Sequence, residues 1–150
     1  MFLRLAAVSL ATVAAGTTVL AGAAGAAGLG PLPPLPLLSG PDTLTVKVAD
    51  SGYPDADGTF ELTCDDQAGG NHPARDDACA RLAELAKQGV NPFKAVPEGA
   101  SCTQVYGGPA VADVTGTWQG RKIDAHFSRA NGCEIDRWQN LEPLLPIVRG

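Results

Sequence analysis

The amino-acid sequence predicts an α+β domain built around an antiparallel sheet. Two short stretches alternate between apolar and polar residues, as half-buried strands do. A third region has the pattern of a β-hairpin, and one stretch has the three-four spacing of a helix. Strands grouped around a single clear helix are typical of the α+β class. The 150 residues leave room for one ordinary domain.

Two predicted strands precede the helix, Thr43–Val48 and Thr59–Cys64, with turn-forming residues between them at Asp50–Gly58. Every second residue in each strand is apolar, which places the apolar side chains on one buried face. The residues expected on that face are Leu44, Val46, Val48, Phe60, Leu62 and Cys64. A polar segment, Asp65–Arg75, is expected to be a loop that leads to the helix.

The predicted helix begins at Asp76–Asp77, because acidic residues in a first turn interact favourably with the helix dipole, and it ends at Gly89. Its expected apolar face consists of Cys79, Leu82, Ala83, Leu85 and Ala86. A hairpin is predicted farther along the chain, with strands Val111–Trp118 and Arg121–Phe127 joined by a turn at Gln119–Gly120. The buried residues of its second strand are expected to be Ile123, Ala125 and Phe127.

Residues 1–27 have the composition of a secretory signal peptide. A short basic start ends at Arg4, an apolar run extends from Leu5 to Leu20, and small residues after it offer cleavage positions. The alternative is a membrane anchor, since the run approaches the length that spans a bilayer. Its many small residues, and the lack of a basic cluster after it, favour cleavage. We therefore expect a secreted, extracellular protein with no membrane association after cleavage.

Residues 28–41 contain five of the twelve prolines and are predicted to form an extended linker, because proline fixes φ and lacks a donor. The globular domain is then expected at residues 42–150. The chain is acidic, with a net charge of −5, and its Lys and Arg residues are scattered. It therefore lacks the basic surface that nucleic-acid binding requires.

Four cysteines lie beyond the signal segment, and an even number in a small exported domain indicates two disulfides. Four cysteines allow three connectivities, of which we expect the local one, Cys64–Cys79 with Cys102–Cys133. That pairing would join the second strand to the helix, and a loop to the segment after the hairpin. A zinc site is the alternative, but no CxxC or HxxxH spacing supports it. We expect no metal and no cofactor.

The sequence gives little support for catalysis. His72 and His126 are the two histidines that could act as bases near neutral pH, and their positions favour a packing role and a solvated strand position respectively. The acid pair Asp76–Asp77 fits a helix start, and no serine lies in a GxSxG motif. We therefore expect a protein that is not an enzyme.

The segment Ser101–Pro109 combines a cysteine, a β-branched residue, an aromatic residue and turn formers. On its own it would be expected to be a structural loop. Part of it belongs to an ordered set of short stretches in which the chain resembles the Streptomyces subtilisin inhibitor family of secreted serine protease inhibitors. These stretches are LTV at Leu44–Val46, ELTC ending at Cys64, HPA at His72–Ala74, ACARLA at Ala78–Ala83, CTQVY at Cys102–Tyr106, TWQG at Thr117–Gly120 and NGCEID at Asn131–Asp136.

The resemblance implies a five-stranded antiparallel sheet, two helices and the same two disulfides. It also implies inhibition of subtilisin-like serine proteases through a scissile bond after the second residue that follows the third cysteine, which is Gln104–Val105. The loop residues implied to contact the protease beside that bond are Ser101, Cys102, Thr103 and Tyr106.

The chain departs from the family pattern at several positions. Gln104 stands where the family often has Met, Lys or Arg, and Thr103 stands where proline is common. Gly107–Gly108 adds backbone freedom, and the tail from Arg137 to Gly150 is longer and contains proline. These differences leave an alternative function, a non-inhibitory secreted binding or structural protein on the same scaffold.

The resemblance further implies a homodimer formed by the outer faces of two sheets. The outer positions of the predicted strands are polar, whereas obligate dimer interfaces are usually apolar. These positions include Thr43, Thr45, Lys47, Asp124 and His126. Trp118 could supply an aromatic anchor, although the pattern around it does not fix its face. We expect a dimer weaker than is typical of the family.

Overall fold

The computed structural model describes residues 40–149, so the expected signal peptide, and the linker except for its last two residues, lie outside the described residues. The described residues form a five-stranded sheet with the order β3-β2-β1-β4-β5, in which all neighbouring strands are antiparallel. The strands are β1 (Asp42–Ala49), β2 (Gly58–Cys64), β3 (Gly69–Gly70), β4 (Val111–Trp118) and β5 (Arg121–Phe127). The predicted α+β class is confirmed, including both disulfides.

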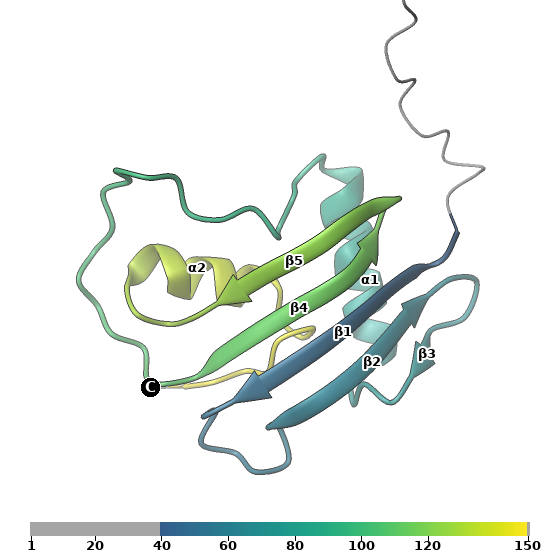
Figure 1. Ribbon diagram of the computed structural model, residues 1–150, viewed down its shortest axis with the longest axis horizontal. Coiled ribbons are helices and arrows are strands. Elements are labelled where there is room, and N and C mark those ends of the chain that lie inside the picture. The colour runs from purple at the N-terminus through teal and green to yellow at the C-terminus, as the bar shows by residue number, and fades with distance from the viewer. Residues whose placement is uncertain (1–39, 150) are drawn as a thin grey trace, which may run out of the picture. The chain divides into compact units, whose positions relative to one another are not determined.

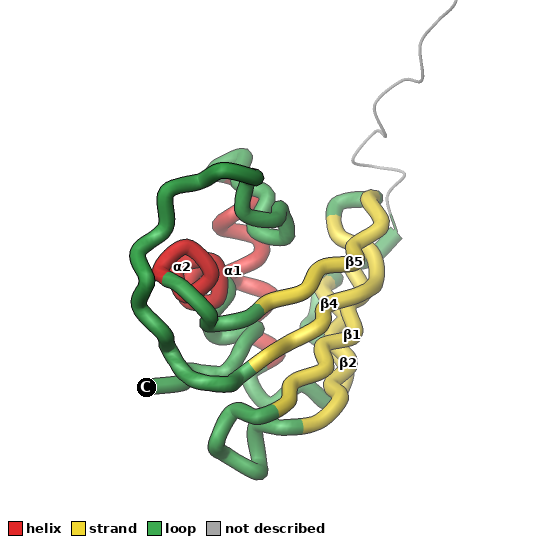
Figure 2. The backbone as a smooth tube through the Cα atoms, turned by 60° about the vertical axis from the view of Figure 1, so that its left-hand side comes forward, coloured by secondary structure: helices red, strands yellow, loops and turns green. Residues whose placement is uncertain are grey.

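Both helices, α1 (Arg75–Lys87) and α2 (Gly132–Asn140), cover the same face of the sheet (Figures 1 and 2). Asp76 and Asp77 lie in the first turn of α1, as predicted. The helix ends in a left-handed C-cap turn at Gly89, whose φ is +68°. The Gly89 N–H donates a hydrogen bond to Ala86 O, and the Val90 N–H donates one to Leu85 O. No helix within residues 40–149 is long and apolar enough to cross a membrane.

The alternating strand pattern sets the buried face of the sheet. Leu44, Val46, Val48 and Leu62 are buried as predicted, whereas Phe60 and Cys64 are partly buried at the border of the core. The second hairpin strand buries Ile123, Ala125 and Phe127. Trp118 also points to the helix side and is buried against Phe93, edge to face with 5.4 Å between ring centroids. Because it is on the inner face, Trp118 cannot anchor a contact through the outer face.

Two local predictions from the residues were wrong. The segment Asp65–Arg75 is not wholly a loop, because Gly69 and Gly70 pair with β2 as the short edge strand β3. Only glycine fits at position 70, where φ is +94° and an added Cβ would lie 2.0 Å from Glu61 O. On α1, Ala78 is buried and Ala83 is exposed, so the apolar face is rotated slightly from the expected one.

Helix α2 was expected only from the family resemblance. Asn131 caps it, accepting a hydrogen bond from Glu134 N–H at 3.1 Å. Asn followed three residues later by Glu is a recognisable helix-start signal.

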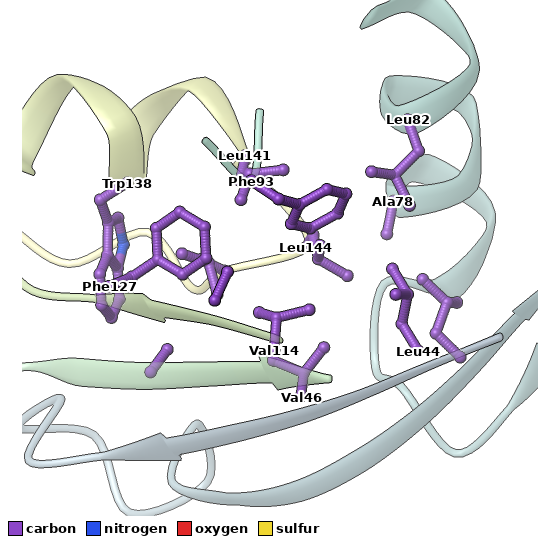
Figure 3. Close-up of a cluster of buried hydrophobic side chains, with 14 of the residues drawn as sticks. Leu44, Val46, Ala78, Leu82, Phe93, Val114, Phe127, Trp138, Leu141 and Leu144 are labelled. Atoms are coloured by element: carbon purple, nitrogen blue, oxygen red, sulfur yellow. The ribbon is translucent and has the colours of Figure 1, made fainter. Parts of the chain in front are cut away.

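The C-terminal tail is part of the core. Trp138 is fully buried beside Phe127, and its indole N–H donates to Pro146 O at 2.9 Å (Figure 3). The other apolar tail residues in the core are Leu141, Leu144, Leu145 and Val148. The tail therefore packs between the helices and the sheet, which its prolines had not suggested.

Candidate functional site

The long connection from α1 to β4 contains the segment predicted to be the functional loop, Ser101–Pro109. It has no helix or strand, and it passes beside the N-terminal end of α2 (Figures 1 and 2). Thr103 and Gln104 are exposed, and Val105 and Tyr106 are 57% and 66% exposed. Adjacent exposed aliphatic and aromatic side chains form an apolar surface of the kind that partners bind.

The N-terminal side of this exposed segment is attached to the start of α2. A disulfide joins Cys102 to Cys133, and Gly132 N–H donates to Thr103 O at 2.9 Å. Gly132 and Thr103 are so close that a Cβ on residue 132 would lie 2.0 Å from Thr103 Oγ1. A side chain at position 132 would force Thr103 to shift, so glycine at the helix start favours this close approach of the loop.

The C-terminal side is attached to the segment that follows β5. Gly107 N–H donates to Arg129 O, and Arg129 Nε–H donates back to Gly107 O, both at 2.8 Å. Gly107 is buried, although its neighbour Tyr106 is the most exposed large apolar residue within the described part of the chain. The chain therefore enters the interior within one residue.

Between these two attachments, the main-chain N–H and C=O groups of Gln104, Val105 and Tyr106 make no hydrogen bond to residues 40–149. The Gln104 side-chain amide makes a long contact, 3.5 Å, with Cys102 O. Three consecutive residues thus present both side chains and unpaired main-chain groups to solvent. Such a segment can add to the edge of another protein's sheet.

A family model described as "Subtilisin inhibitor-like" matches residues 41–131. The chain belongs to the subtilisin inhibitor-like family. The match includes the whole Ser101–Pro109 loop and Arg129, and it ends before Cys133. The attachment of the loop to α2 therefore lies partly beyond the matched residues.

Two relatives from Streptomyces illustrate the similarity. The chain is 42% identical over 72 residues to subtilisin inhibitor-like protein 3 of Streptomyces coelicolor, covering 48% of this chain and 64% of the relative. It is 43% identical over 74 residues to subtilisin inhibitor-like protein 2 of Streptomyces rochei, covering 48% and 61%. The alignments thus span less than two thirds of either relative.

Among solved structures, the crystal structure of Streptomyces caespitosus sermetstatin in complex with Bacillus licheniformis subtilisin matches with a TM-score of 0.46 and 24% identity. That match covers 72% of this chain and all of the sermetstatin chain.

The histidines and the acid pair that were considered as catalytic groups lie in separate parts of the fold. His72 is buried; its Nδ1 accepts from Ala74 N–H at 3.2 Å, and its Nε2 is 2.9 Å from Leu144 O. These partners assign the neutral tautomer with the proton on Nε2. Burial lowers the pKa of His72, partly offset by the hydrogen bond to Leu144. The predicted packing role of His72 is confirmed.

The second histidine, His126, lies on the outer face of the sheet. Its Nδ1 is 2.7 Å from Asp113 on the neighbouring strand, and both side chains are more than half exposed. The Asp76–Asp77 pair lies at the start of α1. All four cysteines are in disulfides, so none can supply a thiolate to zinc.

Proposed function

We propose that the chain is a secreted inhibitor of subtilisin-like serine proteases that presents the Gln104–Val105 bond to the protease as a substrate would. The observation that carries the proposal is the exposed Gln104–Tyr106 segment, whose main chain is unpaired between attached residues on both sides. A loop that is already held in place loses little conformational entropy on binding. Its main-chain groups can then pair with an extended edge of the protease cleft.

The side chains of the loop would occupy successive positions in that cleft. Gln104 would enter the primary specificity pocket, and Thr103, Cys102 and Ser101 would line the acyl side. Val105 and Tyr106 would contribute exposed apolar surface on the leaving-group side. A long, uncharged amide can enter a broad pocket without needing a charged partner, which favours subtilisin-like proteases over trypsin-like ones.

Attack by the protease at this bond would be reversible. The serine oxygen forms an ester with the Gln104 carbonyl carbon, and the Val105 nitrogen leaves as an amine carrying the proton from that serine. When the amine attacks the ester carbon, the peptide bond re-forms and the serine recovers its proton. If water attacks first, the chain is cut and Gln104 becomes a free carboxylic acid. Because residues on both sides are attached, the amine stays near the ester and re-formation competes with hydrolysis.

Titration of a subtilisin of known active-site concentration with the oxidised protein tests this function. The account expects protease activity to fall in near-stoichiometric proportion to the added protein, with most of the chain intact afterwards. Undiminished protease activity together with a fragmented chain would contradict it and would support the non-inhibitory alternative. Loss of activity that persists over time distinguishes blockage of the active site from competition by an abundant substrate, because a competing substrate is consumed and activity then returns.

We further propose that residues 1–27 are removed on export and that the protein acts outside the cell without catalysing a reaction itself. Two disulfides are consistent with an oxidising compartment. Mass spectrometry of the protein recovered from culture medium should give a chain that begins near residue 28. A chain retained by cells with its first residue intact would refute export.

A homodimer through the outer face of the sheet is proposed as a weak association. That face carries polar and charged side chains, among them Lys47, Glu61, Asp113 and Asp124, and charged residues are depleted in the core of stable interfaces. Sedimentation equilibrium over a micromolar dilution series should show dimer dissociating to monomer. A single monomeric mass at all concentrations would exclude the dimer without affecting inhibition.

A further inference from the structure

Arg129 is a buried arginine directly behind the exposed loop. The residue is only 5% exposed and lies two positions after the end of β5. It contacts Gly107 twice, accepting from the Gly107 N–H through its own carbonyl and donating Nε–H to the Gly107 carbonyl. One residue therefore satisfies both main-chain groups of Gly107.

The buried guanidinium of Arg129 has few close partners besides Gly107. Within the described residues Arg129 Nη1 has no hydrogen-bond partner, and the guanidinium lies 5.9 Å from the centroid of the Trp138 ring. The hydrogen bond to Gly107 is the one side-chain hydrogen bond that Arg129 makes within the described residues. The charge of Arg129 also partly offsets the effect of burial, which raises the pKa of the Glu142 carboxyl.

Gly107 in turn fits closely against Arg129. A Cβ on residue 107 would lie 3.0 Å from Arg129 Nε and 3.0 Å from the Ile135 side chain. A larger residue at position 107 would therefore force the Arg129 or Ile135 side chain to move. The contact depends on both partners.

We propose that Arg129 is a positioning residue of the inhibitory loop, which holds Gly107 so that the amine released at Val105 stays next to the acyl carbon of Gln104. The inference rests on the proposed function. Only Val105 and Tyr106 separate the new amine from Gly107, so the tether is limited to about 7 Å, the extended length of two residues. On the other side, Gln104 directly follows Thr103, whose carbonyl is bound by Gly132. Arg129 would thus control the leaving-group half of the cleaved loop, which the Cys102–Cys133 disulfide does not hold.

The test compares Arg129→Met with Arg137→Met in complexes with subtilisin. Arg137 is a matched control, because it also stacks over an aromatic ring, Phe127 at 4.4 Å, and donates to a loop carbonyl, Lys94 O at 2.9 Å. We expect Arg129→Met to be cleaved at Gln104–Val105 about tenfold to a hundredfold faster than the wild type, the effect of one lost charged hydrogen bond. Arg137→Met should be cleaved at the wild-type rate.

A second variant protects the test against a failure to fold. Gly107→Ala disturbs the same contact from the loop side, and in a double-mutant cycle its effect on cleavage should be strongly non-additive with Arg129→Met. A purely structural role of Arg129 would lower the unfolding midpoint and leave the two effects on cleavage additive. If Arg129→Met or Gly107→Ala inhibits subtilisin and is cleaved at the wild-type rate, the positioning role of Arg129 is overturned, and the proposed function stands. Absence of inhibition by the wild type would overturn the proposed function, and this inference with it.

Discussion

The two disulfides join chemically similar residues in very different surroundings. Cys64–Cys79 links β2 to α1 and packs against the hydrophobic core. Cys102–Cys133 links the exposed loop to the first turn of α2, beside residues that contact solvent. Their sequence separations are 15 and 31, so chain entropy assigns both a stabilisation of about 3–4 kcal/mol.

Stabilisation alone therefore does not distinguish the two bonds, whereas their surroundings do. Cys64 and Cys79 pack against a core of buried side chains that includes Leu62 of β2 and Ala78, Leu82 and Leu85 of α1, and this core also keeps β2 on α1. The loop between Cys102 and Gly107 has few, namely the disulfide and the hydrogen bonds at Thr103 and Gly107. Changes in the core should alter the free energy of unfolding, and changes in the loop should alter inhibition.

The largest expected effect is on target choice. Gln104→Lys supplies the positive charge that the carboxylate in a trypsin pocket binds, so inhibition of trypsin should tighten by about three orders of magnitude or more. Because Gln104 is exposed, the unfolding free energy should change by no more than about 0.5 kcal/mol. Inhibition constants for trypsin and subtilisin, with thermal melts, check both halves. Unchanged inhibition of trypsin would place the specificity residue elsewhere.

Removal of the loop disulfide should convert the inhibitor into a substrate. In Cys102→Ser/Cys133→Ser the acyl side of the loop loses its covalent attachment, and the lifetime of the subtilisin complex should fall on the order of 100-fold. The measurement is made on protein shown by circular dichroism to be folded. A complex as long-lived as that of the wild type would mean that the hydrogen bonds suffice to hold the loop.

Removal of the core disulfide should lower stability and leave inhibition unchanged. Cys64→Ser/Cys79→Ser should lower the free energy of unfolding by about 3 kcal/mol, measured by urea denaturation. The complex lifetime of the remaining folded protein should match the wild type, since neither cysteine contacts the loop. A shortened lifetime in this variant would break the distinction between the two regions.

A single methyl group tests the attachment at Thr103. Gly132→Ala improves helix propensity at the start of α2, yet its Cβ would overlap Thr103 Oγ1 and displace the loop. We expect inhibition of subtilisin to weaken about tenfold with an unchanged or higher melting temperature. As a control, Ala130→Gly alters an exposed neighbour without touching Thr103. Equal inhibition by Gly132→Ala and the wild type would show that Thr103 can move without consequence.

The smallest expected effect is a pH dependence of stability that comes from His72 in the core. The folded-state pKa of His72 lies below its ordinary value because burial disfavours the charged ring. Below about pH 6.5 the unfolded chain takes up this proton before the folded protein does, so stability falls as pH decreases towards the folded-state pKa. Urea denaturation at pH 7.5 and pH 5 should show a smaller loss for His72→Gln than for the wild type. The exposed residue His126, changed to Gln, is the control, and an equal reduction there would contradict the assignment.

The contrast between regions also explains what the sequence could predict. Alternation in β1, β2 and the hairpin identified those strands because one face of each is buried and the other is not. The burial of the tail around Trp138 depends on contacts with distant residues, and Pro143 and Pro146 interrupt any regular pattern there. Helix α2 is only nine residues long and has one fully buried residue, so its periodicity is weak.

The candidate site divides in the same way. The exposed residues Gln104, Val105 and Tyr106 were identified from their resemblance to family motifs, and their exposure agrees with that role. The residues that hold them were only partly foreseen. The disulfide of Cys133 was predicted. Gly132 and Arg129 contact the loop through close approach and burial, which leave no mark on the sequence pattern.

The most direct test of the central claim is the equilibrium at the Gln104–Val105 bond. Intact protein and protein cut once at this bond are incubated separately with catalytic amounts of subtilisin, and the two forms are quantified by mass spectrometry. The account predicts that both mixtures reach the same ratio of intact to cut chain, because the attachments keep the new ends together. Cleavage at another bond, or complete cleavage without any re-formation from the cut protein, would contradict it.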